Sequence, residues 1–340
     1  MQQDIYGTLQ GGTEVRAFTM QNKNGLRVRC ISYGCRVTNI WVPNPGGQPV
    51  DVVLGFDNLA GYEADATFQG TLVGRYANRI RGAGFKLGDK WYGLIQNEGD
   101  NYLHGLLHQR VFEAEVIGEN SIAFTYTSPE GEEGFPGEVW LGVTYTLTED
   151  NELVMDFRGK STADTHLNLT NHAYFNLAGE GDVLGHALRL NSGEFLEADS
   201  QLLPTGQTLP VEDGPFDFRR EKPVGRDIAS QDAQLAPVGG YDHCFVLDKN
   251  GTGIELAAEL RHPQSGRALR VFTTQPAVQL YTSNMLDVPL GKGGAALKKY
   301  AGLCLEAQHY PDSPNHPEFP STLVMAGEKY RQATVLHFLW

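Results

Sequence analysis

Short runs of β-branched and aromatic residues recur along almost the whole chain, separated by turns of Gly, Pro, Asn and Asp. Examples are SIAFTYTS (121–128), ELVMDFRGKST (152–162) and AVQLYTSN (277–284). This pattern is typical of antiparallel strands joined by tight connections. Helical periodicity is nearly absent, and only 57–65 and 228–236 are expected to form a turn or two of helix. The chain is therefore predicted to be all-β, a large antiparallel β-sandwich with very little helix.

No linker divides the sequence. The 40 Gly and 17 Pro are spread through the chain, which has no repeat of fixed period and no low-complexity tract. The hydrophobic share of 41% is enough to form a sizeable core. We therefore expect one domain covering residues 1–340.

The net charge of -14 argues against nucleic acid and anionic membranes as partners, because both require a positively charged surface. The first residues lack the basic start and apolar segment of a signal peptide, and no apolar run is long enough to cross a bilayer. We expect a soluble, cytoplasmic monomer or homodimer that binds a small, uncharged molecule.

The four cysteines show no CxxC pairing, and each lies in or beside an apolar, strand-like run. They are Cys30, Cys35, Cys244 and Cys304. Buried free thiols are the favoured interpretation. A disulfide between the first two remains an alternative that would suit a secreted protein.

The segment NLTNHAYFNLAG (168–179) resembles a strand that carries a histidine among asparagines. With a period of two, apart from Asn171, the apolar face holds Leu167, Leu169, Ala173, Phe175 and Leu177. The polar face holds Asn168, Thr170, His172, Tyr174 and Asn176. A polar face is ordinarily solvent-facing, so this segment predicts a ligand site only together with polar groups on neighbouring strands.

Glu306 lies in LCLEAQHY (303–310), a strongly strand-like and mostly apolar segment. Glutamate is depleted from buried strands, so its presence there requires a reason. One alternative is a structural ion pair with an arginine. The other is a desolvated carboxyl whose raised pKa makes it a usable general base.

Three further segments place polar groups among apolar residues or glycines. They are GRYANRI (74–80), NYLHGL (101–106) and GGYDHCFVL (239–247). Asn78 and Arg79 offer an amide and a guanidinium to hydroxyls or a carboxylate. His104 precedes a glycine that permits close approach of a ligand, and Asp242 lies where a turn meets a strand. Each of these residues also has a purely structural interpretation, as a cap, a loop residue or a turn residue.

Several classes of chemistry find little support. HYPDSPNHP (309–317) contains two histidines and an aspartate, but its three prolines give no fixed ligand geometry, so no metal site is expected. GAGFKLG (82–88) lacks the spacing of a dinucleotide site. No serine has a GxSxG setting and no cysteine has a catalytic one. The remaining His, Glu, Asp, Arg and Asn residues suit acid–base chemistry on a polyhydroxylated molecule.

Seven motifs in a fixed order give the chain a resemblance to the aldose 1-epimerases, also called galactose mutarotases. They are GRYANRI, NYLHG, EGFPG (133–137), TNHAYFNLAG (170–179), YDHCF (241–245), TTQPAVQLYTSN (273–284) and LEAQHYPDSPNHP (305–317). The resemblance implies a large β-sandwich with a sugar-binding cleft and no cofactor. It also implies an enzyme that interconverts the anomers of free hexoses.

The resemblance further implies roles for individual residues. Glu306 is implied as the general base and His172 as the general acid. The sugar-binding residues it implies are Asn78, Arg79, His104, Asp242 and Gln279. In this family a second glycine commonly follows the histidine of NxLHG, whereas this chain has Leu106. We expect this bulkier residue to reshape the pocket and affect the choice of sugar.

Anomer exchange requires a base near O1 and an acid near the ring oxygen at the same time. We expect His172 to protonate the ring oxygen, and Asn171 or Asn176 to fix the local backbone or the orientation of the imidazole ring.

Three alternatives remain open from the sequence. A hexose 6-phosphate mutarotase would require a basic cluster at the cleft. Arg75 and Arg81 are expected to be surface charges, and the sequence places neither of them, nor Arg219 or Arg220, at the cleft. A carbohydrate-binding protein without turnover would not require the Glu–His pair. A glycoside hydrolase would use paired carboxylates, for which Asp242 and Glu306 could be mistaken.

Overall fold

Three antiparallel sheets carry most of the strands of the computed structural model, which describes residues 1–340. The nine-stranded sheet has the order β11 (Glu113–Gly118), β12 (Ser121–Ser128), β13 (Val139–Leu147), β14 (Glu152–Ser161), β28 (Lys329–Leu339), β24 (Ala268–Thr273), β23 (Glu255–Arg261), β18 (Ala187–Leu190), β21 (Lys222–Pro223). The six-stranded sheet has the order β17 (Tyr174–Phe175), β26 (Leu303–Gln308), β25 (Ala277–Tyr281), β22 (Asp242–Val246), β19 (Glu194–Ala198), β20 (Pro204–Pro210). The five-stranded sheet runs β1 (Gln2–Thr8), β2 (Glu14–Gln21), β3 (Arg27–Ile31), β4 (Arg36–Val42), β5 (Val50–Asp51).

Short ladders and single turns of helix complete the fold. The two-stranded ladders are β7 (Arg79–Ile80) with β10 (Tyr102–Leu103), β6 (Leu72–Val73) with β16 (Thr170–Asn171), β15 (Thr165–His166) with β27 (Leu323–Val324), and β8 (Gly84–Leu87) with β9 (Lys90–Gly93). The 3₁₀ turns are η1 (Arg81–Ala83), η2 (Leu107–Gln109), η3 (Glu132–Gly134), η4 (Lys292–Gly294) and η5 (Ser313–Asn315). The one α-helix is α1 (Leu59–Glu63). No helix has the length and hydropathy that crossing a membrane requires.

The helix expected at 57–65 is confirmed as α1. Asn58 caps it, since Oδ1 accepts a hydrogen bond from the backbone N–H of Gly61 at 3.1 Å. The segment 228–236 forms no regular helix, but one i→i+4 turn is closed by a hydrogen bond from the N–H of Ala236 to the carbonyl of Asp232 at 2.9 Å. Among the longer strands, β1, β2, β11, β19 and β20 were not predicted. Of these, β1, β11 and β20 are largely exposed and lack a regular apolar alternation.

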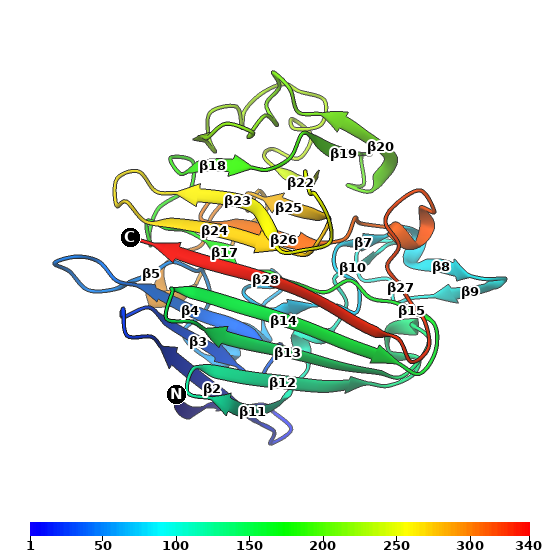
Figure 1. Cartoon of the computed structure of the whole chain (residues 1–340), viewed down its shortest axis with the longest axis horizontal. Helices are drawn as coiled ribbons and strands as arrows, with labels where there is room; N and C mark the ends of the chain where they lie inside the picture. Colours follow the sequence, from blue (N-terminus) through cyan, green and yellow to red (C-terminus); the bar gives the residue numbers. More distant parts are fainter.

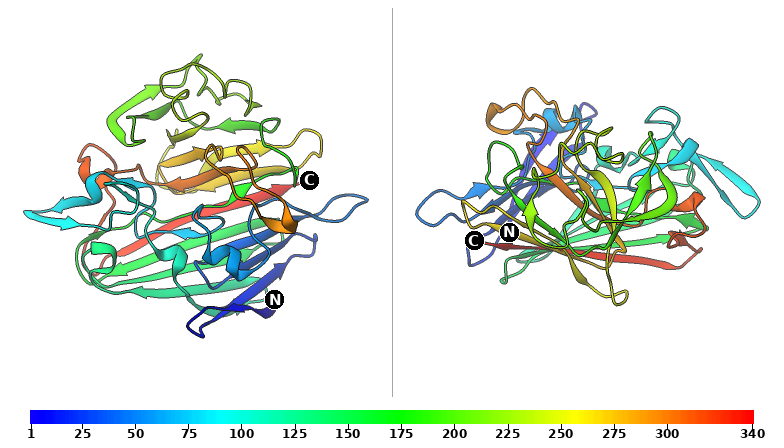
Figure 2. Two further views of the ribbon diagram at one scale, coloured as in Figure 1. Left: turned by 180° about the vertical axis from the view of Figure 1, so that it is seen from behind. Right: turned by 90° about the horizontal axis from the view of Figure 1, so that it is seen from above.

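The long strands β12, β13, β14 and β28 of the nine-stranded sheet run side by side across the molecule, and β25 and β26 of the six-stranded sheet lie behind β23 and β24 (Figure 1). The two sheets pack face to face through apolar side chains. Leu305 and Ala307 of β26 line one small internal gap together with Met155 and Phe157 of β14. The view from above in Figure 2 shows this layering, and it shows the β8–β9 hairpin projecting at one end. The second face of the six-stranded sheet is thereby left for polar residues.

The predicted faces of 168–179 are confirmed on the apolar side, since Leu167, Leu169, Phe175 and Leu177 are buried in the main core. The segment is not one continuous strand, however. β16 pairs with β6 and β17 pairs with β26, and His172 lies in the break between them.

All four cysteines are buried and free, as predicted. The alternative of a disulfide between Cys30 and Cys35 is therefore wrong.

Candidate active site

Polar residues of three adjacent strands align across the six-stranded sheet. Gln279 on β25 lies opposite Glu306 on β26, while Tyr281 on β25 lies opposite Asp242 on β22 and Cys304 on β26. Directly paired residues point to the same face of a sheet, and so do residues two apart in one strand. All five side chains therefore share the face that does not pack on the nine-stranded sheet.

Three of these residues, Tyr281, Asp242 and Glu306, line the floor of a cleft with a volume of about 260 Å³. Of the seven residues predicted for the site, those that line the cleft are Asn78, Arg79, His104, His172, Asp242 and Glu306. Gln279 does not line it, but its Nε2 donates a hydrogen bond to Oδ1 of Asp242 at 2.7 Å. A cleft of this size with converging polar groups suits one small polyhydroxylated ring.

The backbone of His172 is fixed on both sides. Its N–H donates to the carbonyl of Thr71, and its carbonyl accepts from the N–H of Gly70, both at 2.9 Å. Nδ2 of Asn171 donates to the carbonyl of the same glycine at 2.9 Å. These contacts support the predicted role of Asn171 in holding the local backbone.

Two aromatic rings enclose the imidazole of His172. The ring of Tyr174 lies 5.0 Å away and that of Phe68 lies 6.0 Å away, each inclined by 25°. The backbone of Phe68 has a φ of +59°, which is uncommon for a non-glycine residue and costs free energy. Phe68 was not predicted from the sequence, because an isolated aromatic residue in a polar loop carries no periodic signal.

His172 and Glu306 form a buried acid–base pair. Nε2 of the histidine lies 3.7 Å from Oε1 of the glutamate, and their residues are only 4% and 2% exposed. Burial, reinforced by nearby Asp242 and opposed by Arg79, raises the pKa of Glu306 well above its ordinary value. Burial also lowers the pKa of His172 to about 4. In the protein alone the pair is therefore neutral, with its shared proton on Glu306.

Cys304 lies on the other side of the imidazole, with Sγ 3.5 Å from Nδ1 of His172. Burial, together with the nearby carboxyls of Glu306 and Asp242, raises the pKa of this thiol well above its usual value, so it stays protonated. Its sulfur can accept a weak hydrogen bond from Nδ1–H, which places the ring proton of neutral His172 on Nδ1 and leaves Nε2 free to share the proton of Glu306. Nε2 is the nitrogen that faces Glu306.

The β7–β10 ladder places Asn78 beside His104. The backbone N–H of Asn78 donates to Nδ1 of His104 at 3.1 Å, so this nitrogen is an acceptor and the ring proton lies on Nε2. Both residues have a positive φ, +66° and +59°. Burial, with smaller contributions from nearby His172 and Arg79, lowers the pKa of His104 well below its usual value. His104 is therefore a neutral hydrogen-bond donor.

A metal ion does not fit the donor set of the cleft. The possible ligand atoms of His104, His172 and Glu306 lie within 4.8 Å of one another, a combination of residue types found in zinc enzymes. His104 could coordinate through Nε2 only with its proton moved to Nδ1. On Nδ1 the proton would point at the backbone N–H of Asn78, which is also a hydrogen-bond donor.

The two histidines and the aspartate of 309–317 do not form one metal site, because His309 lies apart from the other two. His309 contacts Oε1 of Gln275 through Nδ1 at 2.7 Å, while His316 faces Asp312 at 3.6 Å.

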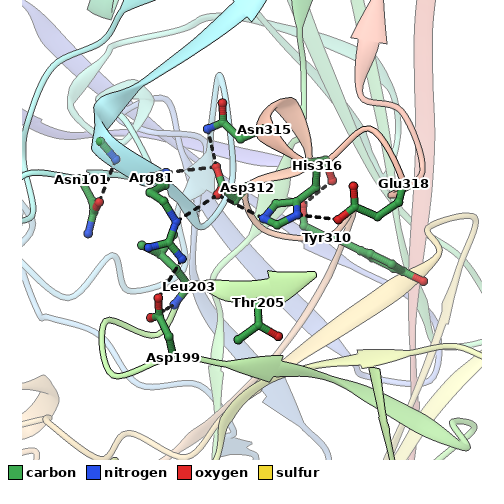
Figure 3. A network of polar contacts seen from close by, with 12 residues as sticks. Arg81, Asn101, Asp199, Leu203, Thr205, Tyr310, Asp312, Asn315, His316 and Glu318 are labelled. Carbon is green, nitrogen blue, oxygen red and sulfur yellow. Dashed lines mark hydrogen bonds and ion pairs between the residues drawn. The ribbon is translucent and has the colours of Figure 1, made fainter. Parts of the chain in front are cut away.

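Asp312 lies at the centre of a polar network with Arg81, Asn315 and His316 (Figure 3). Its N–H donates to the carbonyl of Arg79 at 2.8 Å, and its Oδ1 accepts from the N–H of Arg81 at 3.1 Å and from Nδ2 of Asn315 at 2.7 Å. The buried carboxylate therefore fixes the short strand that begins with Arg79.

Glu98 is a cleft residue that the sequence analysis missed. Its carboxylate binds the Arg79 guanidinium through two hydrogen bonds, Nε to Oε2 at 2.7 Å and Nη2 to Oε1 at 2.6 Å. In the sequence it precedes Gly-Asp in a polar segment and is indistinguishable from a solvent-exposed loop residue.

The expectation that Arg75 is a surface charge is wrong. Its side chain is fully buried, and its guanidinium donates to Oγ of Ser128 and to backbone carbonyls, including that of Gly137 at 3.0 Å. Arg81 is exposed, as expected, and pairs with Asp199 at 2.7 Å (Figure 3). Neither arginine lines the cleft.

Leu106 does not line the cleft either, so the expectation that it reshapes the pocket by contact is wrong. Its φ of -116° is ordinary for any residue and does not require glycine.

The polar cleft of this β-sandwich holds a buried acid–base pair among amide, guanidinium and carboxylate groups. These features place the protein in the class of sugar-processing β-sandwich enzymes. The sequence pattern of the family described as aldose 1-epimerase matches residues 16–337. The chain belongs to the aldose 1-epimerase family and is an isomerase of the mutarotase type, as the motifs predicted.

Individual relatives agree with this assignment over nearly the whole chain. Galactose mutarotase of Mus musculus is 42% identical, covering 98% of this chain and 97% of its own length. Aldose 1-epimerase of Haemophilus influenzae is 37% identical, covering 96% of each. The solved structure of an aldose epimerase homologue from C. elegans has a TM-score of 0.88 at 32% identity, covering 95% of this chain and 98% of its own. The all-β fold is therefore of the galactose mutarotase type.

Proposed function

We propose that the protein interconverts the α and β anomers of free aldoses, such as galactose or glucose, by opening and reclosing the pyranose ring. The observation that carries this proposal is the 3.7 Å approach of His172 to Glu306 inside the cleft. The relative from Mus musculus is named for galactose, which favours that sugar as a first substrate to test.

The reaction transfers two protons. With the closed sugar bound, the proton of the pair lies on His172. The Glu306 carboxylate takes the proton of the C1 hydroxyl while the His172 imidazolium gives its Nε2 proton to the ring oxygen. The bond between C1 and the ring oxygen breaks as the C1 carbonyl forms, and an open-chain aldehyde results. Rotation about C1–C2 presents the other face of the carbonyl, and closure returns both protons to their donors.

The protonation states support these roles. Ring opening leaves Glu306 protonated and His172 neutral, which is the distribution that burial favours in the protein alone. The pair is therefore preorganised for the open-chain aldehyde. A closed sugar favours the charged distribution, because its C1 hydroxyl donates to Glu306 and its ring oxygen accepts from His172.

The other cleft residues bind the sugar hydroxyls in this proposal. Asp242 accepts hydrogen bonds, while Arg79 and His104 donate them. Asn78 contributes its side-chain amide, whose Oδ1 already accepts from the N–H of Arg79 at 2.8 Å. Gln279 acts through Asp242, which it orients.

Polarimetry on freshly dissolved α-galactose and α-glucose tests the proposal. The wild-type protein is expected to accelerate the change in optical rotation, and His172→Asn is expected to lower kcat by roughly 10²–10⁴-fold. Binding of sugar without acceleration would identify a non-catalytic carbohydrate-binding protein. Release of the leaving group from nitrophenyl glycosides would instead identify a glycoside hydrolase.

A further inference from the structure

The wall of the cleft contains an ion pair that the acid–base chemistry does not use. Glu98 holds Nε and Nη2 of Arg79 at 2.7 and 2.6 Å, and its side chain is 34% exposed at the opening. Nη1 of the arginine makes no hydrogen bond within the protein. The guanidinium is thus fixed in one orientation with a single nitrogen left for a ligand.

Acidic side chains outnumber basic ones in the cleft. Its acidic side chains are Glu98, Asp242 and Glu306, and Arg79 is its only lysine or arginine. Burial alone would lower the pKa of Arg79, but the carboxylates of Asp242 and Glu98 raise it, so the guanidinium is already neutralised by protein groups. No cation of the cleft remains free to bind an anion.

The other arginines considered for a phosphate do not line the cleft. The guanidinium of Arg75 is buried against backbone carbonyls, Arg81 pairs with Asp199, and Arg219 pairs with Asp217 at 2.8 Å. Arg220 lines a separate pocket. A hexose 6-phosphate carries about -1.5 to -2 charges near pH 7 and would enter the cleft without a partner.

We propose that Glu98 is a specificity-determining residue, which excludes phosphorylated sugars from the cleft and orients Arg79 toward the hydroxyls of neutral aldoses. This inference rests on the proposed function, because it concerns which aldoses reach the Glu306–His172 pair. Glu98 acts through Arg79 for neutral sugars and through its charge for anionic ones.

The test compares kcat/KM for galactose and galactose 6-phosphate in the wild type, Glu98→Gln and Glu98→Lys. The wild type is expected to favour the free sugar by at least about a hundredfold, and Glu98→Gln to reduce that preference about tenfold by removing one repelling charge. Glu98→Lys is expected to reduce it further. Glu221→Gln is the control, because Glu221 is comparably exposed at 39% and pairs with Arg261 at 3.3 Å outside the cleft.

Ionic strength provides a second readout that requires no variant. Raising the salt concentration from about 0.01 to about 0.5 M shortens the screening length from about 30 Å to a few ångströms. In the wild type this is expected to raise kcat/KM for the 6-phosphate and leave that for the free sugar unchanged.

Two results would overturn the inference. One is a wild type that shows no preference for the free sugar. The other is a Glu98→Gln variant that loses activity toward both sugars in equal proportion, which would leave Glu98 with a supporting role only. Failure of the proposed function would be seen separately, as absence of wild-type turnover on either sugar.

Discussion

Nε2 of His172 lies 3.7 Å from Oε1 of Glu306, and burial moves the pKa values of the two groups in opposite directions. Acid and base roles are commonly found where environments separate the pKa values of two neighbouring groups in this way. Because the two groups share a single proton, the reaction depends on the protonation state of the pair and not of either residue alone.

The pH dependence of kcat/KM follows from this shared proton. The pair holds one proton at neutral pH and gains a second as the pH falls through the His172 pKa of about 4. A doubly protonated pair has no base, so kcat/KM is expected to be flat from neutral pH down to about 5 and to fall below about 4. Initial rates of anomer exchange over pH 3.5–8, corrected for the spontaneous reaction, measure this. A decline already centred near pH 6.5 would mean that His172 titrates as a solvent-exposed imidazole.

Glu133 is expected to be a positioning residue for His104. Its Oε1 accepts a hydrogen bond from the N–H of Leu106 at 2.9 Å. Its Oε2 packs so closely on Gly105, the neighbour of His104, that a Cβ on this glycine would lie only 2.4 Å from it. Glu133→Ala leaves the N–H unpaired and frees the loop. We expect KM to rise about tenfold with a smaller effect on kcat, and the free energy of unfolding to fall by roughly 1–3 kcal/mol.

Glu133→Gln is the matched comparison, because it keeps an acceptor for Leu106 and should restore KM to near the wild-type value. Glu130→Ala, an exposed glutamate in the same turn region, controls for general effects. Equal KM values for Glu133→Ala and the wild type would refute the positioning role.

Buried neutral histidines should make stability depend on pH. Burial lowers the pKa of His166 to about 4, and its residue is 8% exposed against Phe85. In the unfolded chain His166 is protonated below about pH 6.5, whereas in the folded protein it is protonated only below about pH 4. The free energy of unfolding should therefore fall as pH decreases between these values, by about 3 kcal/mol at most for this residue.

Urea unfolding of the wild type and His166→Gln at pH 7, 5.5 and 4.5 measures this contribution. The variant should lose less stability over the range, since the remaining buried histidines still contribute. Equal losses of unfolding free energy in the two proteins over this pH range would show that His166 does not contribute to the pH dependence of stability.

Period-two alternation was sufficient to predict most strands of the nine-stranded sheet and the two faces of β26, but not exposed strands such as β1 and β20. Leu305 packs toward β14 and Glu306 points into the cleft, because strand geometry leaves no other choice. The motifs of the resemblance also predicted the cleft residues, which come from segments far apart in the chain. The break at His172 was missed, because both faces of a broken strand keep the same alternation.

Contacts between long charged side chains could not be predicted. Arg75 and Arg81 lie in similar local sequence, yet the first is buried and the second exposed. Burial of an arginine depends on whether distant carbonyls surround it, here those of Pro136 and Gly137. The Glu98–Arg79 pair depends in the same way on a tertiary contact.

The most direct test of the shared-proton pair is the polarimetric kcat for α-galactose in the wild type, Glu306→Gln, His172→Asn and the double variant. Each single substitution is expected to lower kcat by roughly 10²–10⁴-fold, and the double variant to lose at most about tenfold more, because the two groups act as one unit. A single variant that keeps kcat within about threefold of the wild type, or losses that multiply in full, would contradict the account.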